Sequence, residues 1–307
     1  MGMLPSYIKL VGSMHTRYRF EGPVCSLGSQ DIWASSDDLK RCLEDVGSTF
    51  HEPSAILSHS SRTFGMSAAV AEVAKDFVHA KSMFEAMGIE GYLDMDKFDS
   101  DNPVLLHDLN DPIPNNLKSR FGLVFDGGTI EHIFDVRQVL GNIVDMLQPA
   151  GCVIHLCSFA IDHGFYGFSP VMFYDYYGAN GFGEFECYLM ELDLTDVTRT
   201  YSNQHRCITY EYGMVLDGVL DTSKEILIFF AARKQASLPQ LTVPTQGSYV
   251  RRGNLAEAPM NASQSAFDRL IPHWMQPFVR PVRPLLRMVY RKRKQAQALH
   301  AASIKYI

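Results

Sequence analysis

Residues 121–156 constrain the fold of this chain more than any other stretch. An apolar run, Gly122 to Phe125, predicts a buried strand that ends in a Gly-rich turn. Asp135 is placed to cap a following helix, Pro149-Ala150-Gly151 ends that helix, and Cys152 to Leu156 predicts a second strand. This order of elements is typical of an α/β fold with a largely parallel sheet.

The same alternation continues on both sides of this unit and predicts one α/β domain over residues 1–234. Further strands are predicted at Pro23–Leu27, Gly91–Asp96, Val104–Leu106, Phe185–Leu192 and Ile226–Ala232. Apolar residues recur at helical spacing from Met66 to Met87, and Gly88 follows as a C-cap. Residues 163–182 form a Gly- and aromatic-rich loop in which Ser169-Pro170 is typical of a helix start.

Two segments follow this domain. Residues 235–268 are polar, with scattered Pro and Gly, and predict a linker. Residues 269–307 contain nine Lys or Arg and no acid, which leaves 19 basic residues against 34 acids in 1–268. For 285–299 we consider a helix on an anionic membrane surface, an RNA contact and a solvated tail. The acidic body argues against nucleic acid as a partner.

Composition narrows the class further. The 307 residues are 46% hydrophobic and 20% charged, which excludes a disordered or collagen-like chain. The longest apolar run is far shorter than the roughly 20 residues that a membrane-spanning helix needs, and the N-terminus lacks the apolar core of a signal peptide. The six cysteines form no CxxC pair, so we expect reduced thiols in a cytoplasmic protein.

Ligands of open parallel sheets bind beyond the carboxyl ends of the strands. Acids, amides and glycines gather after the predicted strands, at Gly28-Ser29-Gln30, Asp94 and Asp96, Asp108-Leu109-Asn110, Asp126 to His132, and Ser158-Phe159. The sequence contains neither GxxxxGK[ST] nor GxGxxG, so we expect a nucleoside-like ligand without phosphates.

The acids of this rim have distinct predicted uses. Asp96, with Asp94 as the reserve, offers two acceptor oxygens to the hydroxyls of a ribose. Asp108 offers an acceptor to the exocyclic amine of adenine, while a neighbouring backbone N–H serves a ring nitrogen. The alternative for Asp108 is a capped turn before Pro112.

The stretch from Phe121 to Val136, with Leu147-Gln-Pro-Ala-Gly-Cys-Val-Ile-His155, resembles class I S-adenosylmethionine-dependent methyltransferases. The family's L-x-P-G-G turn carries Ala150 here, and His107-Asp-Leu-Asn110 is similar to its adenine-side acidic motif. The segments His163 to Pro170 and Asn180 to Phe182 resemble a substrate-side loop in uncharacterised methyltransferase-like proteins. The resemblance covers about residues 20–234 and implies a doubly wound, mostly parallel, seven-stranded, Rossmann-like sheet.

The resemblance also implies S-adenosylmethionine as cofactor. The first loop departs from the family because it holds only Gly28, and Ser29 and Gln30 are left to bind the methionine end. The predicted cofactor-binding residues are Gly28, Ser29, Gln30, Asp96, Asp108, Leu109, Asp126, Gly127 and Glu131.

For catalysis, His132 is the first candidate base and His163 the second. The alternatives are that His132 positions the cofactor loop and that His163 is a bonded loop histidine. Some RNA-directed relatives hold a cation with E-x-x-E-H, but Gly128 takes the first position here, so we predict no metal. The aromatic residues of the 163–182 loop are either a pocket wall or core: Tyr166, Phe168, Phe173, Tyr174, Tyr176 and Tyr177.

The sequence thus predicts methyl transfer from S-adenosylmethionine to a small-molecule or glycan-type acceptor. The alternative is a catalytically inactive scaffold or binding protein, tethered by its basic tail. The reduced glycine loop favours the alternative, whereas the acids Asp96 and Asp108 and the Glu131-His132 block favour the enzyme. A nicotinamide-dependent oxidoreductase is disfavoured because GxGxxG is missing.

Overall fold

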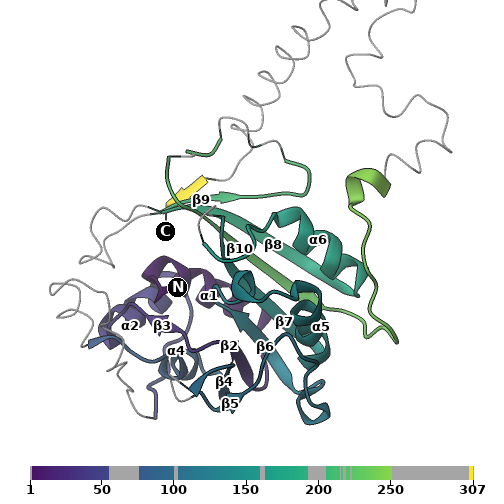
Figure 1. The fold of residues 1–307 in the computed structure, drawn as a ribbon. Helices are drawn as coiled ribbons and strands as arrows, with labels where there is room; N and C mark the ends of the chain where they lie inside the picture. The colour runs from purple at the N-terminus through teal and green to yellow at the C-terminus, as the bar shows by residue number, and fades with distance from the viewer. Residues whose placement is uncertain are drawn as a thin grey trace, which may run out of the picture.

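The computed structural model describes residues 2–54, 76–99, 103–159, 163–192, 205–214, 216, 219–221, 223–250 and 304–306. Figure 1 shows a central sheet with helices on both sides. The predicted basic tail at 269–307 lies outside the described residues except for 304–306, and the predicted linker is described as far as residue 250.

The main sheet has nine strands among the described residues, in the order β11-β9-β8-β10-β7-β6-β2-β4-β5. Their bounds are β2 (Val24–Leu27), β4 (Tyr92–Asp96), β5 (Leu105–Leu106), β6 (Phe121–Asp126), β7 (Leu147–Ser158), β8 (Phe182–Glu191), β9 (Arg206–Thr209), β10 (Ile226–Lys234) and β11 (Ile304–Tyr306). The strands from β5 to β7 are parallel, and β10 runs antiparallel between β7 and β8. A separate parallel pair joins β1 (Gly2–Met3) to β3 (Asp31–Ile32).

Helices cover both faces of the sheet. They are α1 (Pro5–Tyr18), α2 (Ser36–Asp45), α4 (Ala80–Ala86), α5 (Val136–Met146) and α6 (Pro170–Ala179), with 3-10 turns η3 (Asn115–Leu117) and η4 (Ile130–His132). One buried cluster joins α1, α2 and α4 to the sheet through residues such as Leu123 and Phe125. The other cluster joins α5 and α6 to the sheet through Val124, which lies between Leu123 and Phe125 in β6. Because neighbouring strand residues face opposite sides, β6 is packed on both faces.

This architecture confirms the predicted doubly wound α/β fold. In the order of the sheet, the strands β8-β10-β7-β6-β2-β4-β5 make up the predicted number of seven. The strands β9 and β11 extend the sheet beyond that number. The predicted capping of α5 is also confirmed, because the Asp135 side chain accepts from the Gln138 N–H at 3.0 Å. Ser169 likewise caps α6, which has a Pro at its first turn.

The prediction of one continuous helix from Met66 to Met87 is wrong for the described residues that precede α4. Residues 66–75 lie outside the described part of the chain, and α4 begins only at Ala80. The backbone before it is extended, with the Val78 N–H donating to Ala34 O at 3.0 Å. A ring nitrogen of His79 then caps the helix by accepting from the Lys81 N–H at 3.1 Å. The apolar periodicity therefore runs across a break in the helix, while α1 and α2 were not predicted.

The six cysteines are all buried and free, which confirms that they are core residues without disulfides. Burial raises the pKa of the Cys25 thiol to about 12, with a smaller contribution from Asp94, so this thiol is a poor nucleophile. No described helix has the length and apolarity that crossing a membrane requires. The described part of the predicted linker docks on α6, where Asn180 exchanges two hydrogen bonds with the Thr242 backbone.

Candidate functional site

A cavity of about 480 Å³ opens where the strand order reverses between β2 and β6. This is the switch point at which open α/β sheets bind ligands, and the volume suits a small-molecule site. The loops after β2, β4, β5 and β6 line it together with one residue of the 163–169 loop. The lining residues are Gly28, Ser29, Gln30, Met95, Asp96, Lys97, Phe98, His107, Asp108, Leu109, Asn110, Gly127, Gly128, Thr129, His132, Ile133, Phe134 and Phe165.

Most of the predicted site residues therefore lie together at this cavity. The lining contains Gly28, Ser29, Gln30, Asp96, Asp108, Leu109, Gly127 and His132. Asp126, Glu131 and His163 are not in the lining.

Two glycines make room at the floor of the cavity. Gly28 has φ +74°, and a Cβ there would lie 2.9 Å from Thr129 Oγ1. A Cβ on Gly127 would collide with the Gln30 amide, which is itself fixed by donating to Leu27 O at 2.8 Å. The loop thus needs Gly28 for its backbone conformation, and Gln30 occupies the space that a bare Gly127 leaves.

Asp94 and Asp96 differ in what they already bind. The buried Asp94 accepts from the Ser29 hydroxyl at 2.6 Å and from the Val104 N–H at 2.8 Å, so both its oxygens hold the loops. Asp96 is half-buried at the end of β4, and its Oδ1 accepts from the Phe98 N–H at 3.2 Å. Its Oδ2 faces the Gly28 side of the cavity. Asp96 is therefore the carboxylate that can receive a ligand hydroxyl.

Asp108 is held in place by Lys97 and Asn110. Its carboxylate lies 2.7 Å from Lys97 Nζ and accepts from the Asn110 N–H at 3.0 Å and from the Asn110 side chain at 2.7 Å. These hydrogen bonds, from Lys97 first and then Asn110, lower the pKa of Asp108 to about 2. The turn is tied to α5 because Leu109 O accepts a hydrogen bond from the Asn142 side chain. Asp108 is a fixed acceptor that stays ionised at neutral pH.

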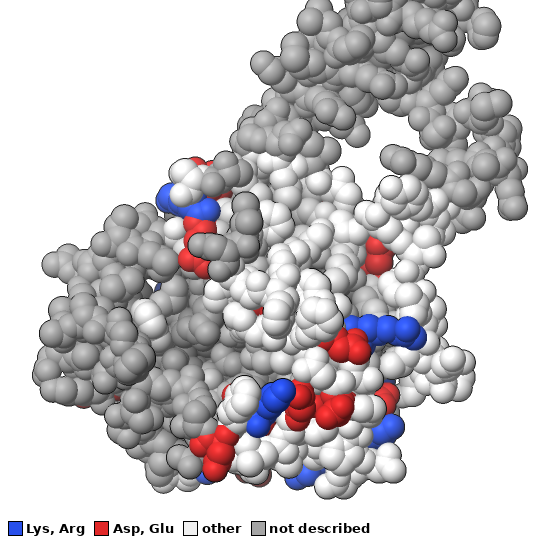
Figure 2. All heavy atoms as spheres, viewed as in Figure 1, with Lys and Arg blue, Asp and Glu red and all other residues white. Residues whose placement is uncertain are grey.

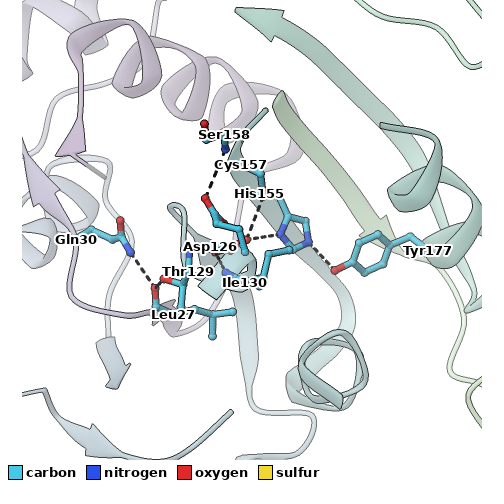
Figure 3. Close-up of polar contacts among 10 residues, drawn as sticks. Leu27, Gln30, Asp126, Thr129, Ile130, His155, Cys157, Ser158 and Tyr177 are labelled. Atoms are coloured by element: carbon cyan, nitrogen blue, oxygen red, sulfur yellow. Dashed lines mark hydrogen bonds and ion pairs between the residues drawn. The ribbon is translucent and has the colours of Figure 1, made fainter. Parts of the chain in front are cut away.

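Asp126 lies in a buried network (Figure 3). One carboxylate oxygen accepts from the Thr129 N–H at 2.9 Å and the Ile130 N–H at 3.3 Å, which starts the η4 turn. The other lies 2.7 Å from His155 Nδ1, and His155 Nε2 lies 2.7 Å from the Tyr177 hydroxyl. Asp126 thus shapes the turn that carries Glu131 and His132 without lining the cavity.

Glu131, His132 and His163 form a second cluster beside the cavity. The rings of His132 and His163 lie 4.8 Å apart at 74°, and His163 Nε2 lies 3.8 Å from Glu131 Oε1. Burial, helped by the Asp126 charge, raises the pKa of Glu131 to about 7. Burial and the neighbouring His163 lower the pKa of His132, which favours the neutral imidazole.

Three exposed phenylalanines edge the cavity: Phe98, Phe134 and Phe165 are 64%, 70% and 64% exposed. Phe134 and Phe165 meet edge to face at 5.6 Å. Sequence reasoning missed them and considered six other aromatic residues of the 163–182 loop, which pack in or against the core instead. Phe98, Phe134 and Phe165 stand at isolated, exposed positions, so they give no periodic signal. Lys97 and Thr129 were missed as well, because their roles depend on distant partners.

Charges on the face of the molecule drawn in Figure 2 are dispersed among the described residues. On the face in Figure 2, the Lys and Arg side chains of the described residues stand beside Asp and Glu rather than in a continuous basic patch. A continuous basic stripe is the usual mark of a nucleic-acid interface.

No family model matches this chain, and no curated protein matches it. Solved structures similar to it include the Burkholderia thailandensis 1,6-didemethyltoxoflavin-N1-methyltransferase with S-adenosylhomocysteine, at 11% identity, 75% and 79% coverage of the two chains and a TM-score of 0.33. A Thermotoga maritima SAM-dependent methyltransferase matches at 12% identity, with 75% and 97% coverage and a TM-score of 0.32.

A third structure is the branched-chain polyamine synthase of Thermus thermophilus, solved with 5'-methylthioadenosine. It is 9% identical, with 80% and 61% coverage and a TM-score of 0.32. The strand order and the cavity define the structural class of this chain directly: a doubly wound, Rossmann-like α/β domain with a cavity at its switch point.

Proposed function

We propose that this chain transfers the methyl group of S-adenosylmethionine to a small-molecule acceptor. The observation that carries the proposal is that Asp96 and Asp108, from neighbouring strand ends, line one cavity with Gly28 and Gly127. Two carboxylates suit the hydroxyls and amine of a nucleoside and would repel a phosphate chain. Lys97, the basic residue of the lining, is already paired with Asp108.

The residues fit the cofactor at three points. Asp96 would accept from the ribose hydroxyls, and Asp108 beside Leu109 would accept from the adenine amine. Gly28 keeps the floor free of a Cβ atom where the methionine end would lie, with Ser29 and Gln30 as its polar neighbours, while Gln30 fills the space beside Gly127. When bound, the cofactor supplies a methyl group activated by its sulfonium.

The chain's own contribution to the reaction is mainly positioning. His132 lines the cavity, and the ring of His163 packs against the ring of His132. These two imidazoles are therefore the candidates to take a proton from the acceptor. Phe134 and Phe165 at the edge offer ring faces to a planar acceptor, and a glycan-type acceptor would use the same faces. His132 and His163 would thus act on the group that Phe134 and Phe165 hold.

Calorimetric titration with S-adenosylmethionine and S-adenosylhomocysteine tests this function. We expect the natural chain to bind at least one of these two compounds with a micromolar Kd. In Asp96→Ala the Kd should rise 5- to 150-fold, because the ribose hydroxyls lose their acceptor at a cost of roughly 1–3 kcal/mol. Asp99→Ala is the matched control, because Asp99 is exposed on the same loop and does not line the cavity. An equal loss in both variants would remove Asp96 from the site.

The titration also separates the enzyme from the alternative, a methyltransferase-like scaffold. Gln30 crowds the space beside Gly127, which is the observation that favours the scaffold. No binding of either compound at millimolar concentration by a folded chain would overturn methyl transfer. Vesicles containing anionic lipid would then test the membrane contact that is one of the alternatives for residues 285–299.

A further inference from the structure

We propose that Glu131, His132 and His163 bind one divalent transition-metal ion beside the cavity. The prediction that the chain binds no metal depended on spacing around Glu131 and His132 alone. The structure adds a donor from a separate loop, because it brings His163 against both residues. The proposal concerns this three-residue cluster, called the open cluster below.

The donor atoms of the open cluster are close enough to share an ion. One ligand atom from each of the three residues lies within 4.8 Å of the others, and His163 Nε2 is 3.8 Å from Glu131 Oε1. Ligands bound at about 2.1 Å in a tetrahedral site lie about 3.4 Å apart. Side-chain movements of about an ångström would therefore complete the site.

The carboxylate of Glu131 also lacks what a buried carboxylate needs. Its side chain is fully buried, and among the described residues Oε2 has no hydrogen-bond partner. The other oxygen accepts a long hydrogen bond from the Ser158 N–H at 3.5 Å and lies 3.8 Å from His163 Nε2, and the Cys157 thiol and the Glu131 backbone N–H also lie against this carboxylate. His163 Nε2 is a second buried atom without a hydrogen bond among the described groups. Unpaired buried charge is costly, and a cation between these atoms would satisfy both.

The two loops of the open cluster are fixed to each other by their backbones. The Phe165 N–H donates to Glu131 O at 2.7 Å. Gly164 has φ +74°, and a Cβ there would lie 2.6 Å from the same carbonyl oxygen. The Tyr166 hydroxyl then donates to Phe134 O at 2.8 Å. The approach of His163 to Glu131 is thus built into the backbone.

The donor set points to a class of metal. Two imidazoles and one carboxylate suit Zn²⁺, Fe²⁺, Mn²⁺ or Co²⁺, whereas Mg²⁺ and Ca²⁺ prefer all-oxygen ligands. Three protein ligands leave coordination positions open. Because His132 lines the cavity, an ion bound to this side chain would lie at the cavity's edge. If the proposed methyl transfer is right, an acceptor oxygen would take one of the open positions, and the ion would lower the pKa of that hydroxyl. His132 and His163 would then serve as ligands of the ion, and would be candidate bases only in the metal-free chain.

Calorimetric titration of the untagged, chelator-treated full-length chain with Zn²⁺, Mn²⁺ and Co²⁺ tests the site. We expect one ion per chain for at least one metal, with a Kd at least tenfold higher in Glu131→Gln and in His163→Ala. His51→Ala is the control, since this exposed histidine lies outside the cluster, and its Kd should be unchanged. Cobalt adds a second readout, because its visible absorption band should be lost in both cluster variants.

The proposal is overturned if no metal binds at one per chain, or if Glu131→Gln binds as tightly as the natural chain. It is also overturned if His51→Ala loses as much affinity as the cluster variants, which would indicate adventitious surface binding. Circular dichroism of each variant confirms that it is folded. These titrations contain no S-adenosylmethionine, so the metal site and the proposed methyl transfer fail independently.

Discussion

Two clusters of similar side chains lie near the ends of β6 and β7, and they differ in whether their polar atoms have partners. The closed cluster, Asp126 with His155 and Cys157, is fully buried, and hydrogen bonds occupy both carboxylate oxygens and both ring nitrogens. The open cluster, Glu131 with His132 and His163, contains two buried atoms without a partner among the described residues. Proximity of ligand-type residues alone therefore does not identify a site.

The closed cluster explains the shape of the open one. Asp126 begins the η4 turn through the Thr129 and Ile130 N–H groups, and that turn carries Glu131 and His132 to the cavity. His155 in turn fixes Asp126 and stacks on Phe173 at 4.6 Å. Satisfied polar groups thus supply rigidity, and the unsatisfied ones beside them are left for a ligand.

The largest effect is expected from His155→Ala in the closed cluster. The change leaves the Asp126 charge buried without its strongest partner and removes the ring that packs on Phe173. We expect the free energy of unfolding to fall by about 3–5 kcal/mol, measured by urea denaturation.

Tyr177→Phe is the matched control for that change. It keeps the ring and deletes only the hydroxyl that meets His155 at 2.7 Å, so a loss of about 1–2 kcal/mol is expected. Equal stability of His155→Ala and the natural chain would show that the closed cluster is not holding the fold.

Glu131→Gln in the open cluster is expected to change the free energy of unfolding less than His155→Ala does, when both are measured without metal. Glutamine keeps an oxygen for the Ser158 N–H and removes a carboxylate that has few partners to lose. The free energy of unfolding in chelator should change by less than about 1 kcal/mol. Adding metal should then stabilise the natural chain and not the variant, and the gain should grow with the logarithm of metal concentration over Kd.

The same urea denaturation, run with chelator and with Zn²⁺, makes this comparison. A loss in chelator as large as that of His155→Ala would mean that Glu131 is a bonded structural residue like Asp126. The distinction between the two clusters would then be wrong.

Much of the fold was predictable because its signals are local. The apolar runs of β6 and β7, the Asp135 cap and the Ser169-Pro170 helix start each depend on a few adjacent residues. The missed α1 shows the limit: Leu4 precedes it with no side-chain cap, so nothing local marks its start except Pro5. The helix predicted before Ala80 failed because a tertiary bond from Val78 to Ala34 competes with it.

The candidate site divides in the same way. Asp96 and Asp108 were placed at the cavity from strand ends alone, which the topology rule supplies. The roles of Asp126 and His155 depend on a side-chain contact between adjacent strands, and spacing cannot show which oxygens are already bonded. The contact of His163 with Glu131 depends on a loop docking by its backbone, and no motif in the sequence encodes it.

The smallest effect is expected on the pKa of Asp108, whose carboxylate has its hydrogen-bond partners at the surface rather than in the core. Lys97→Ala removes the largest cause of its low pKa, and we expect that pKa to rise from about 2 toward the usual value near 4. Because the pKa is depressed in the folded chain, the pair stabilises the fold above the ordinary pKa of Asp. That contribution is lost as the pH falls toward about 2.

Carbon-13 NMR titration of the Asp108 carboxyl measures this shift, with Lys118→Ala as control, since Lys118 pairs with Asp145 away from the cavity. If the pKa of Asp108 stays near 2 in Lys97→Ala, Asn110 alone fixes the carboxylate. Asp108 would then resemble Asp126, whose backbone donors lie within its own turn, and the cavity would keep its acceptor without Lys97. A rise toward 4 would instead make Lys97 a positioning residue for the adenine-side acceptor, held from a neighbouring strand end.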